Sequence, residues 1–352
     1  MIKNITGNID FIESLRGKSA TFMLALSNTD TAKIEGITQA GIPGMIHLTP
    51  TLDSEFLCSG EVRSLDNIAK TPKGVPTPAL ITRAVHLLHP YNNIELLNLG
   101  VEVTPKLQYF TTHNFDMIPS GSIEHGASIE AQEIFQKGVE FGQNYECKND
   151  YIILGESVPS GTTTAAATAT ALQYNVTNMF SSSFKNVPTD IRQTTIVKAL
   201  HNVKEEDDIF EILSKVSDNM IIFNAGFILG LNNKIPLILA GGTQMACVLL
   251  VVNKILEMMD GVIETSNLAL CTTSWVANDT NSDIKALIEL LNFEINSYYC
   301  DFNFSLSNHP ALKLYDNGEA KEGVGAGGAL IYGVLNGLNK QQITTKVEEF
   351  LQ

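Results

Sequence analysis

The sequence lacks the features that mark several large classes of protein. Its five cysteines are an odd number without a CxxC pair, so neither a disulfide framework nor a cysteine zinc site is indicated. No lysine- or arginine-rich run interrupts a formal net charge of −15, which argues against nucleic-acid binding. The N-terminus has no apolar signal core, and the longest wholly apolar stretch, residues 245–252, is too short to span a bilayer. These absences predict a cytoplasmic protein that binds neither nucleic acid nor membranes.

Motifs for metal-dependent or covalent catalysis are also missing. His86 and His89 form an HxxH pair, but no carboxylate lies beside them at a metal-motif spacing, so surface or structural histidines are favoured over metal ligands. The sequence has no serine–histidine pair of recognisable spacing, no nucleophile elbow and no cluster of carboxylate ligands. We therefore expect no metal, no cofactor and no covalent intermediate.

What the sequence does contain is an alternation of short β-rich runs with helical patterns, in a chain of 352 residues that is 44% hydrophobic and 17% charged. The expected strands are residues 20–27, 151–154, 235–240, 268–272 and 298–302. The expected helices are residues 79–89, 129–141, 162–173, 190–202, 218–231, 243–258 and 283–291. This order predicts an α/β fold, with a mostly parallel, doubly wound (Rossmann-like) sheet and helices on both of its faces.

The two ends of the chain predict a different arrangement. Helices expected at residues 325–338 and 341–351 have no strand between them, and a third helix is expected around residues 11–15. We interpret residues 20–325 as the α/β domain, and residues 1–19 and 326–352 as a small helical lobe. Much of the sequence within the first hundred residues is rich in glycine and has little periodicity, so few helices or strands can be predicted there.

Residues 155–164, GESVPSGTTT, follow an expected strand and lead into a helix. In open parallel sheets, ligands bind beyond the carboxyl ends of the strands. Gly161 permits close backbone approach, Thr162 and Thr163 supply hydroxyls, and the helix N-terminus presents free N–H groups, which together suit a phosphate. The lysine of a Walker loop is absent, which disfavours a nucleoside triphosphatase. The alternative is an ordinary strand-to-helix turn capped by threonine.

Two further strand ends carry polar turns. Gly241, Gly242 and Thr243 follow the expected strand at residues 235–240 and have the same character, although they could form a simple turn. The only tryptophan, Trp275, lies in a polar stretch where it could stack on an aromatic ligand or belong to the core.

Glu322 precedes four glycines within six residues, in the segment KEGVGAGGA. With so few side chains around it, its carboxylate could reach a ligand closely, and a dry site would raise its pKa. The alternative is an acidic residue that stabilises a helix N-terminus.

The motifs GESVPSGTTTAAA, AGGTQMA and KEGVGAGGA resemble those of the nicotinate-nucleotide:dimethylbenzimidazole phosphoribosyltransferase family, in particular its archaeal and cyanobacterial branch. The segment GSIEHG at residues 121–126 supports the resemblance, as does the chain length. The resemblance implies transfer of phosphoribose from nicotinate mononucleotide to a benzimidazole-like base, without a cofactor, by a homodimer. The ADHG-type segment of the bacterial enzymes is missing here, so the acceptor could be dimethylbenzimidazole, another benzimidazole or adenine.

The resemblance also implies roles for individual residues. Glu322 matches the catalytic glutamate of the family, and Glu156 matches a glutamate that orients the ribose or phosphate end. Arg192 falls near a lysine that contacts phosphate. The remaining residues that we expect to bind substrate or phosphate are Gly161, Thr162, Thr163, Gly241, Gly242, Thr243 and Gly325.

Two other functions remain compatible with the sequence. The same loops could belong to a non-catalytic nucleotide-binding or regulatory protein, or the glycine-rich turns could serve packing alone in a scaffold protein.

Overall fold

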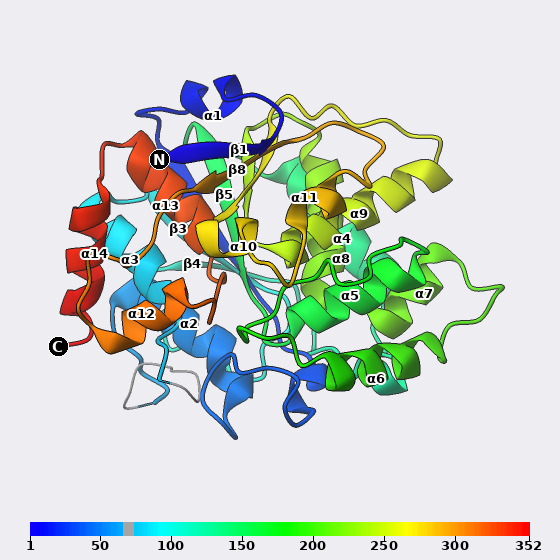
Figure 1. Ribbon diagram of the computed structural model, residues 1–352. Coiled ribbons are helices and arrows are strands. Elements are labelled where there is room, and N and C mark those ends of the chain that lie inside the picture. The colour runs from blue at the N-terminus through cyan, green and yellow to red at the C-terminus, as the bar shows by residue number, and fades with distance from the viewer. Residues whose placement is uncertain (66–73) are drawn as a thin grey trace.

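A sheet of eight strands runs through the middle of the computed structural model, which describes residues 1–65 and 74–352 (Figure 1). The strand order is β1-β8-β7-β6-β5-β2-β3-β4, and every pairing within it is parallel except that of β1 with β8. The strands are β1 (Ile2–Thr6), β2 (Ala20–Leu26), β3 (Asn93–Asn98), β4 (Thr111–Asn114), β5 (Tyr151–Ser157), β6 (Leu237–Ala240), β7 (Leu268–Thr273) and β8 (Asn296–Cys300). The predicted mostly parallel α/β fold is confirmed.

Helices cover both faces of the sheet (Figure 1). One face carries α1 (Asp10–Ser14), α2 (Thr49–Ser59), α3 (Ala79–Leu88), α12 (Pro310–Asp316), α13 (Ala326–Leu335) and α14 (Lys340–Glu349). The other carries α4 (Ala131–Asn144), α5 (Gly161–Ala171), α6 (Thr189–Leu200), α7 (Ile209–Val216), α8 (Asn219–Leu231), α9 (Thr243–Met258) and α11 (Ile284–Ile288). The short helix α10 (Ser274–Ala277) follows β7 directly, and 3₁₀ helices span Asp30–Lys33, Ile46–Leu48 and Ile123–His125.

The central strands are apolar on both sides because each face of the sheet is covered. In β2 the side chains alternate between two hydrophobic clusters. Phe22 and Leu24 pack into the cluster that contains α3 and α13, whereas Met23 and Ala25 pack into the cluster that contains α8 and α9. No helix in the part of the chain described by the structure is long and apolar enough to cross a membrane.

The two ends of the chain differ from the prediction in one respect. Residues 2–6 form β1 at the edge of the main sheet, where a helical lobe was expected. The strand IKNIT is short and half polar, so its sequence carries little strand signal. Helix α13 lies directly on the sheet, since a Cβ on Gly327 would meet the carbonyl carbon of Thr272 at 2.3 Å. The division into residues 20–325, and 1–19 with 326–352, stays a prediction about domains.

The order in which the chain adds strands to the sheet reverses between β2 and β5. From β2 it proceeds outward through β3 to β4, then returns to β5 beside β2 and proceeds the opposite way through β6 to β8. At such a switch point the loops that follow neighbouring strands diverge and leave a crevice, which is where open α/β sheets bind their ligands.

Candidate active site

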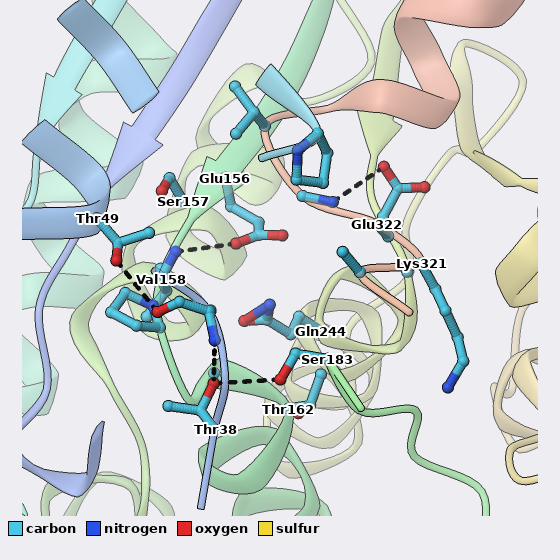
Figure 2. Close-up of a pocket in the computed structure, with 18 of the residues that line it drawn as sticks. Thr38, Thr49, Glu156, Ser157, Val158, Thr162, Ser183, Gln244, Lys321 and Glu322 are labelled. Atoms are coloured by element: carbon cyan, nitrogen blue, oxygen red, sulfur yellow. Dashed lines mark hydrogen bonds between the residues drawn. The ribbon is translucent and has the colours of Figure 1, made fainter. Parts of the chain in front are cut away.

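A cavity lies beyond the carboxyl ends of β2, β5 and β6, at this switch point (Figure 2). Thr38, Thr162 and Ser183 lie at one end of it, Glu156 and Glu322 lie toward the other, and Gln244 lies between them. The lining residues come from stretches far apart in the sequence, within residues 38–53, 77–78, 156–162, 181–183, 242–244, 276 and 320–324.

The N-terminus of α5 provides the first end of the cavity. Ser160 precedes the helix in a left-handed conformation with φ 68°, and its side chain does not cap the helix. Its hydroxyl is buried without a hydrogen-bond partner among the described residues. Gly161 leaves room for the Gln244 side chain, because a Cβ at position 161 would lie 1.7 Å from the Gln244 Oε1 atom. The unpartnered Ser160 hydroxyl and the helix dipole make this end suitable for an anion.

Arg192 on α6 lies behind this helix terminus. It is 8% exposed, and it donates hydrogen bonds to Thr162 Oγ1 at 2.9 Å and to the Phe180 carbonyl at 2.9 Å. Burial lowers the pKa of Arg192 to about 10, which still leaves it charged at neutral pH. Because Thr162 Oγ1 accepts from the guanidinium, its own proton is available to a ligand in the cavity.

Glu322 lies in the turn between α12 and α13, and four donors hold its carboxylate. Oε1 accepts from the Gly327 and Gly323 amides at 3.0 and 3.3 Å, and Oε2 accepts from the Thr273 amide and the Thr272 hydroxyl at 2.9 and 3.1 Å. Burial raises the pKa of Glu322 to about 7, although these hydrogen bonds lower it. A carboxyl with a pKa near neutrality can take and release a proton at physiological pH.

Glu156, at the end of β5, is 2% exposed and accepts one hydrogen bond, from the Val158 amide at 3.1 Å. Burial, followed by the charge of Glu322, raises the pKa of Glu156 to about 8. Its backbone carbonyl accepts from the Val324 amide at 2.8 Å, and a Cβ on Gly155 would meet Gly325 Cα at 3.0 Å. These contacts join the end of β5 to the turn that carries Glu322.

Asp53 on α2 is a third carboxyl on the lining of the cavity, and sequence reasoning did not identify it. It accepts hydrogen bonds from the Thr77 hydroxyl at 2.6 Å and the Ser157 hydroxyl at 2.7 Å. Burial raises the pKa of Asp53 to about 6, against the effect of these two bonds. Its helix, TPTLDSEFLCS, is buried along nearly its whole length and so shows little amphipathic periodicity.

The loop containing Ser181, Ser182 and Ser183 closes one side of the cavity and was also missed. Lys321 holds it through a hydrogen bond to the Phe184 carbonyl at 3.0 Å, and it pairs with Asp279 at 3.0 Å, both side chains being 3% exposed. A run of three serines with no periodicity could only have been recognised as a loop. Its place at the site depends on these tertiary contacts.

The predicted site residues fall into two groups. Those that line the cavity are Glu156, Gly161, Thr162, Gly242, Thr243 and Glu322. Those that lie behind its lining are Thr163, Arg192, Gly241 and Gly325. Gly325 has φ 67° and lies against Phe22 and Gly155, so its place in the structure is a packing position at the start of α13.

Two other expectations can be compared with the structure. Trp275 belongs to the core, where it stacks on Phe304 with ring centroids 5.7 Å apart and donates to Asp316 at 3.1 Å. Within the described residues, no group of three or more histidine, cysteine or acidic side chains is arranged to hold a metal ion.

Comparison with known proteins identifies relatives along the whole chain. No family model matches. The UPF0284 protein of Sulfurisphaera tokodaii is 34% identical over 354 residues, which cover 100% of this chain and 97% of that protein. The UPF0284 protein of Methanothermobacter thermautotrophicus is 33% identical over 355 residues, which cover 98% and 96%.

Two solved structures share the fold at low sequence identity. The nicotinate-nucleotide-dimethylbenzimidazole phosphoribosyltransferase of Thermus thermophilus matches with a TM-score of 0.60 and 14% identity, over 96% of this chain and 84% of that one. A structure of CobT from the same organism matches with a TM-score of 0.58 and 14% identity, over 98% and 91%. The chain therefore belongs to the UPF0284 family, and its fold is that of the nicotinate-nucleotide:dimethylbenzimidazole phosphoribosyltransferases, as the sequence motifs predicted.

Proposed function

We propose that the protein is a phosphoribosyltransferase of cobamide synthesis. It moves phosphoribose from nicotinate mononucleotide to a benzimidazole-like base and forms an α-ribazole phosphate-type nucleotide. The observation that carries this proposal is that one cavity is lined both by the N-terminus of α5, suited to a phosphate, and by Glu322, a carboxyl whose pKa is near 7. Both solved structures named above support it through their shared fold.

The chemistry suits residues that position substrates and move one proton. In nicotinate mononucleotide, C1′ is bonded to a positively charged pyridinium nitrogen. When that bond breaks, its electron pair stays with the nitrogen, and the ring nitrogen becomes neutral without help from an acid or a metal. A lone pair of the acceptor base forms the new bond to C1′, and Glu322 takes the N–H proton that the base then loses. Holding the two reactants side by side supplies much of the remaining acceleration.

The phosphate would bind at the α5 end of the cavity. Gly161 and Thr162 line that end, and Gly242 and Thr243 line the cavity beside Gln244. Arg192 would act on the phosphate through the Thr162 hydroxyl, to which it donates, rather than by direct contact. We further propose that Thr163, Gly241 and Gly325 support these loops from behind, and that the enzyme is a cytoplasmic homodimer.

The activity can be tested directly. Incubation of the protein with nicotinate mononucleotide and dimethylbenzimidazole, another benzimidazole or adenine should release nicotinate and yield an α-ribotide, detected by chromatography and mass spectrometry. Absence of product with every one of these bases would contradict the proposal.

The role of Glu322 can be tested by Glu322→Gln. This change keeps the size of the side chain but removes the proton acceptor, so we expect kcat to fall by about 10²–10⁴-fold while nicotinate mononucleotide still binds. The matched control is Glu95→Gln, because Glu95 is a buried carboxyl on β3 that lines a different cavity. Turnover that survives in Glu322→Gln would exclude Glu322 as the base.

A second candidate function is nucleotide binding without transfer. It is favoured by the four hydrogen bonds that Glu322 accepts, because each carboxylate oxygen already has two donors and Glu322 could act as a structural anchor of its turn. Saturable binding of nicotinate mononucleotide in calorimetry, without any product from the bases above, would support this function.

A further inference from the structure

The two ends of the cavity differ in charge. At the α5 end, the helix N-terminus and the Arg192 guanidinium behind Thr162 give a positive potential. Toward the other end lie Glu156 and Glu322, which Figure 2 shows well separated from Thr162. A cavity polarised in this way complements a ligand with a negative group at one end and a positive group at the other.

Three carboxyls share the second end without a cation of their own. Asp53, Glu156 and Glu322 all line the cavity, and the charges of Asp53 and Glu322 both act on Glu156. In the described part of the chain, none of the three forms an ion pair. Lys321, which precedes Glu322 and also lines the cavity, pairs instead with Asp279. Ionised carboxyls that are buried without a cationic partner are unfavourable, and a bound cation would compensate for part of the lost solvation.

Unpartnered oxygen atoms point independently to a missing ligand. Gln244 is 9% exposed and Ser160 is 5% exposed, and both line the cavity. Gln244 Oε1 and Ser160 Oγ are buried, and neither has a hydrogen-bond partner among the described residues. Buried polar atoms are normally paired, so these two indicate that the cavity is completed by a polar ligand that spans the space between its two ends.

We propose that Asp53, Glu156 and Glu322 together bind the positive charge of an N-ribosylated pyridinium ring, so that the site selects a nucleotide with a pyridinium nitrogen over one of the same shape in which carbon replaces that nitrogen. This inference rests on the proposed function, adds Asp53 to its substrate-binding groups and assigns Glu156 to the ring rather than to the ribose or phosphate end. The phosphate occupies the α5 end, and the ring lies toward the carboxyls.

The same carboxyls remain complementary throughout the transfer. Positive charge starts on the ring nitrogen, moves toward C1′ as the ring leaves, and passes to the acceptor base as the new bond forms. It disappears when Glu322 takes the proton of the base. An arrangement of fixed charges that matches each stage needs no reorganisation during the reaction.

Binding of a cationic ring should release protons. The charges that act on Glu156 are those of Glu322 before α13, Asp218 at the start of α8 and Asp53 on α2. Elsewhere around the cavity are the Lys321–Asp279 pair and Arg192, which lies behind Thr162. Burial raises the pKa of Glu156 to about 8 and that of Glu322 to about 7, so at pH 7 Glu156 is mostly protonated and Glu322 about half protonated. A nearby cation favours the ionised forms and lowers both pKa values. The contribution of the pyridinium charge to affinity should therefore rise as pH increases from 6 to 8 and level off above the pKa of Glu156.

The test compares two ligands that differ only in ring charge. One is nicotinate mononucleotide, and the other is the ribose 5-phosphate C-glycoside of benzoate, in which carbon replaces the ring nitrogen. Both rings carry a carboxylate, so the first ring has no net charge and the second is an anion. Isothermal titration calorimetry at pH 7, in two buffers of different ionisation enthalpy, counts the protons released. We expect nicotinate mononucleotide to release about 0.5–1 proton more than the C-glycoside and to bind about tenfold more tightly at pH 8. Protons released by the phosphate itself are common to both ligands and cancel.

Variants assign the effect to particular carboxyls. Glu156→Gln and Asp53→Asn should each reduce the preference for the charged ring several-fold, whereas the control Glu95→Gln should leave it unchanged. Equal affinity and equal proton release for the two ligands in the unmodified protein would overturn the inference, even if both variants failed to fold. If phosphoribose is transferred but ring charge has no effect, only this inference fails. If neither ligand binds, the proposed function fails with it.

Discussion

At the scale of single residues, the environment of Glu322 combines two opposing influences. Burial favours the protonated form of its carboxyl, and four hydrogen-bond donors favour the ionised form, with the result that its pKa is about 7. The donors also fix the carboxylate within the turn, because they come from both β7 and the first residues of α13. A fixed base with a pKa near neutrality is what proton transfer at physiological pH requires.

This balance predicts a pH dependence of the reaction. Glu322 must be ionised to accept a proton, and its pKa in the free protein is about 7, so kcat/KM for nicotinate mononucleotide should rise as pH increases through about 7. Ionisation of Glu156, with a pKa of about 8, would extend the rise toward pH 8. Initial rates measured from pH 5.5 to 9, with the acceptor base at a saturating concentration, test this pH dependence. A profile that is flat or falls between pH 6 and 7 would contradict it.

The sequence identified the residues at the strand ends but not their partners. Glu322, Glu156 and Thr162 lie next to glycines in short motifs, and such motifs can be recognised without knowledge of the fold. Asp53 lies in a helix that is buried on all sides, and its role depends on Ser157, which is 104 residues away in the sequence. Only the folded chain brings these two residues together.

At the scale of elements, α13 places Glu322 by lying unusually close to the sheet. Gly327 faces the backbone of β7, and Gly328 faces Ala240 of β6, where a Cβ would meet the Ala240 Cβ at 2.4 Å. From the sequence, we expected these glycines to leave space around Glu322. They also let the helix approach two strands. That approach brings the amide of Gly327 to the Glu322 carboxylate.

Two glycine substitutions should separate packing from binding. Gly327→Ala puts a methyl group 2.3 Å from the Thr272 backbone, which cannot move aside easily, so we expect a loss of about 1–3 kcal/mol in the free energy of unfolding. In Gly161→Ala the added methyl group meets only the end of the Gln244 side chain, so we expect little change in stability. The displaced Gln244 amide would intrude on the cavity, so we expect about a tenfold higher KM for nicotinate mononucleotide. Urea denaturation and steady-state kinetics measure the two effects. Equal losses of stability in the two variants would argue against this distinction.

Strongly apolar elements were predicted well, and polar edge elements were not. The helix expected at residues 243–258 coincides with α9, and the strand expected at 268–272 differs from β7 by one residue, because both are buried and continuous in hydrophobicity. Strand β4, TTHN, is polar and mostly exposed at the edge of the sheet, so its pairing with β3 is not visible in the sequence. Strand β3 and helix α2 were missed within the glycine-rich first hundred residues.

At the scale of the whole molecule, the ends of the chain are tied to the main sheet. Residues 2–6 pair with β8, and α14 packs with α3 in the same hydrophobic cluster as β2. We therefore expect residues 1–19 and 326–352 to unfold together with residues 20–325, in one cooperative transition.

Scanning calorimetry tests this expectation. Nicotinate mononucleotide at one hundred times its Kd should stabilise the native state by about 2.7 kcal/mol and shift the whole transition to a higher Tm. A separate transition that does not respond to the ligand would instead show an independent lobe.

The wide spacing of the cavity residues also has a consequence for biosynthesis. The stretches that surround the ligand extend from residue 38 to residue 324, and the turn of Glu322 is held by Gly327 of α13. A nascent chain on the ribosome contains the residues of β2, β5 and α5 long before that turn emerges. Such a chain contains Asp53 and Glu156 but lacks Glu322, so under the proposed mechanism translation must be nearly complete before the protein can transfer phosphoribose.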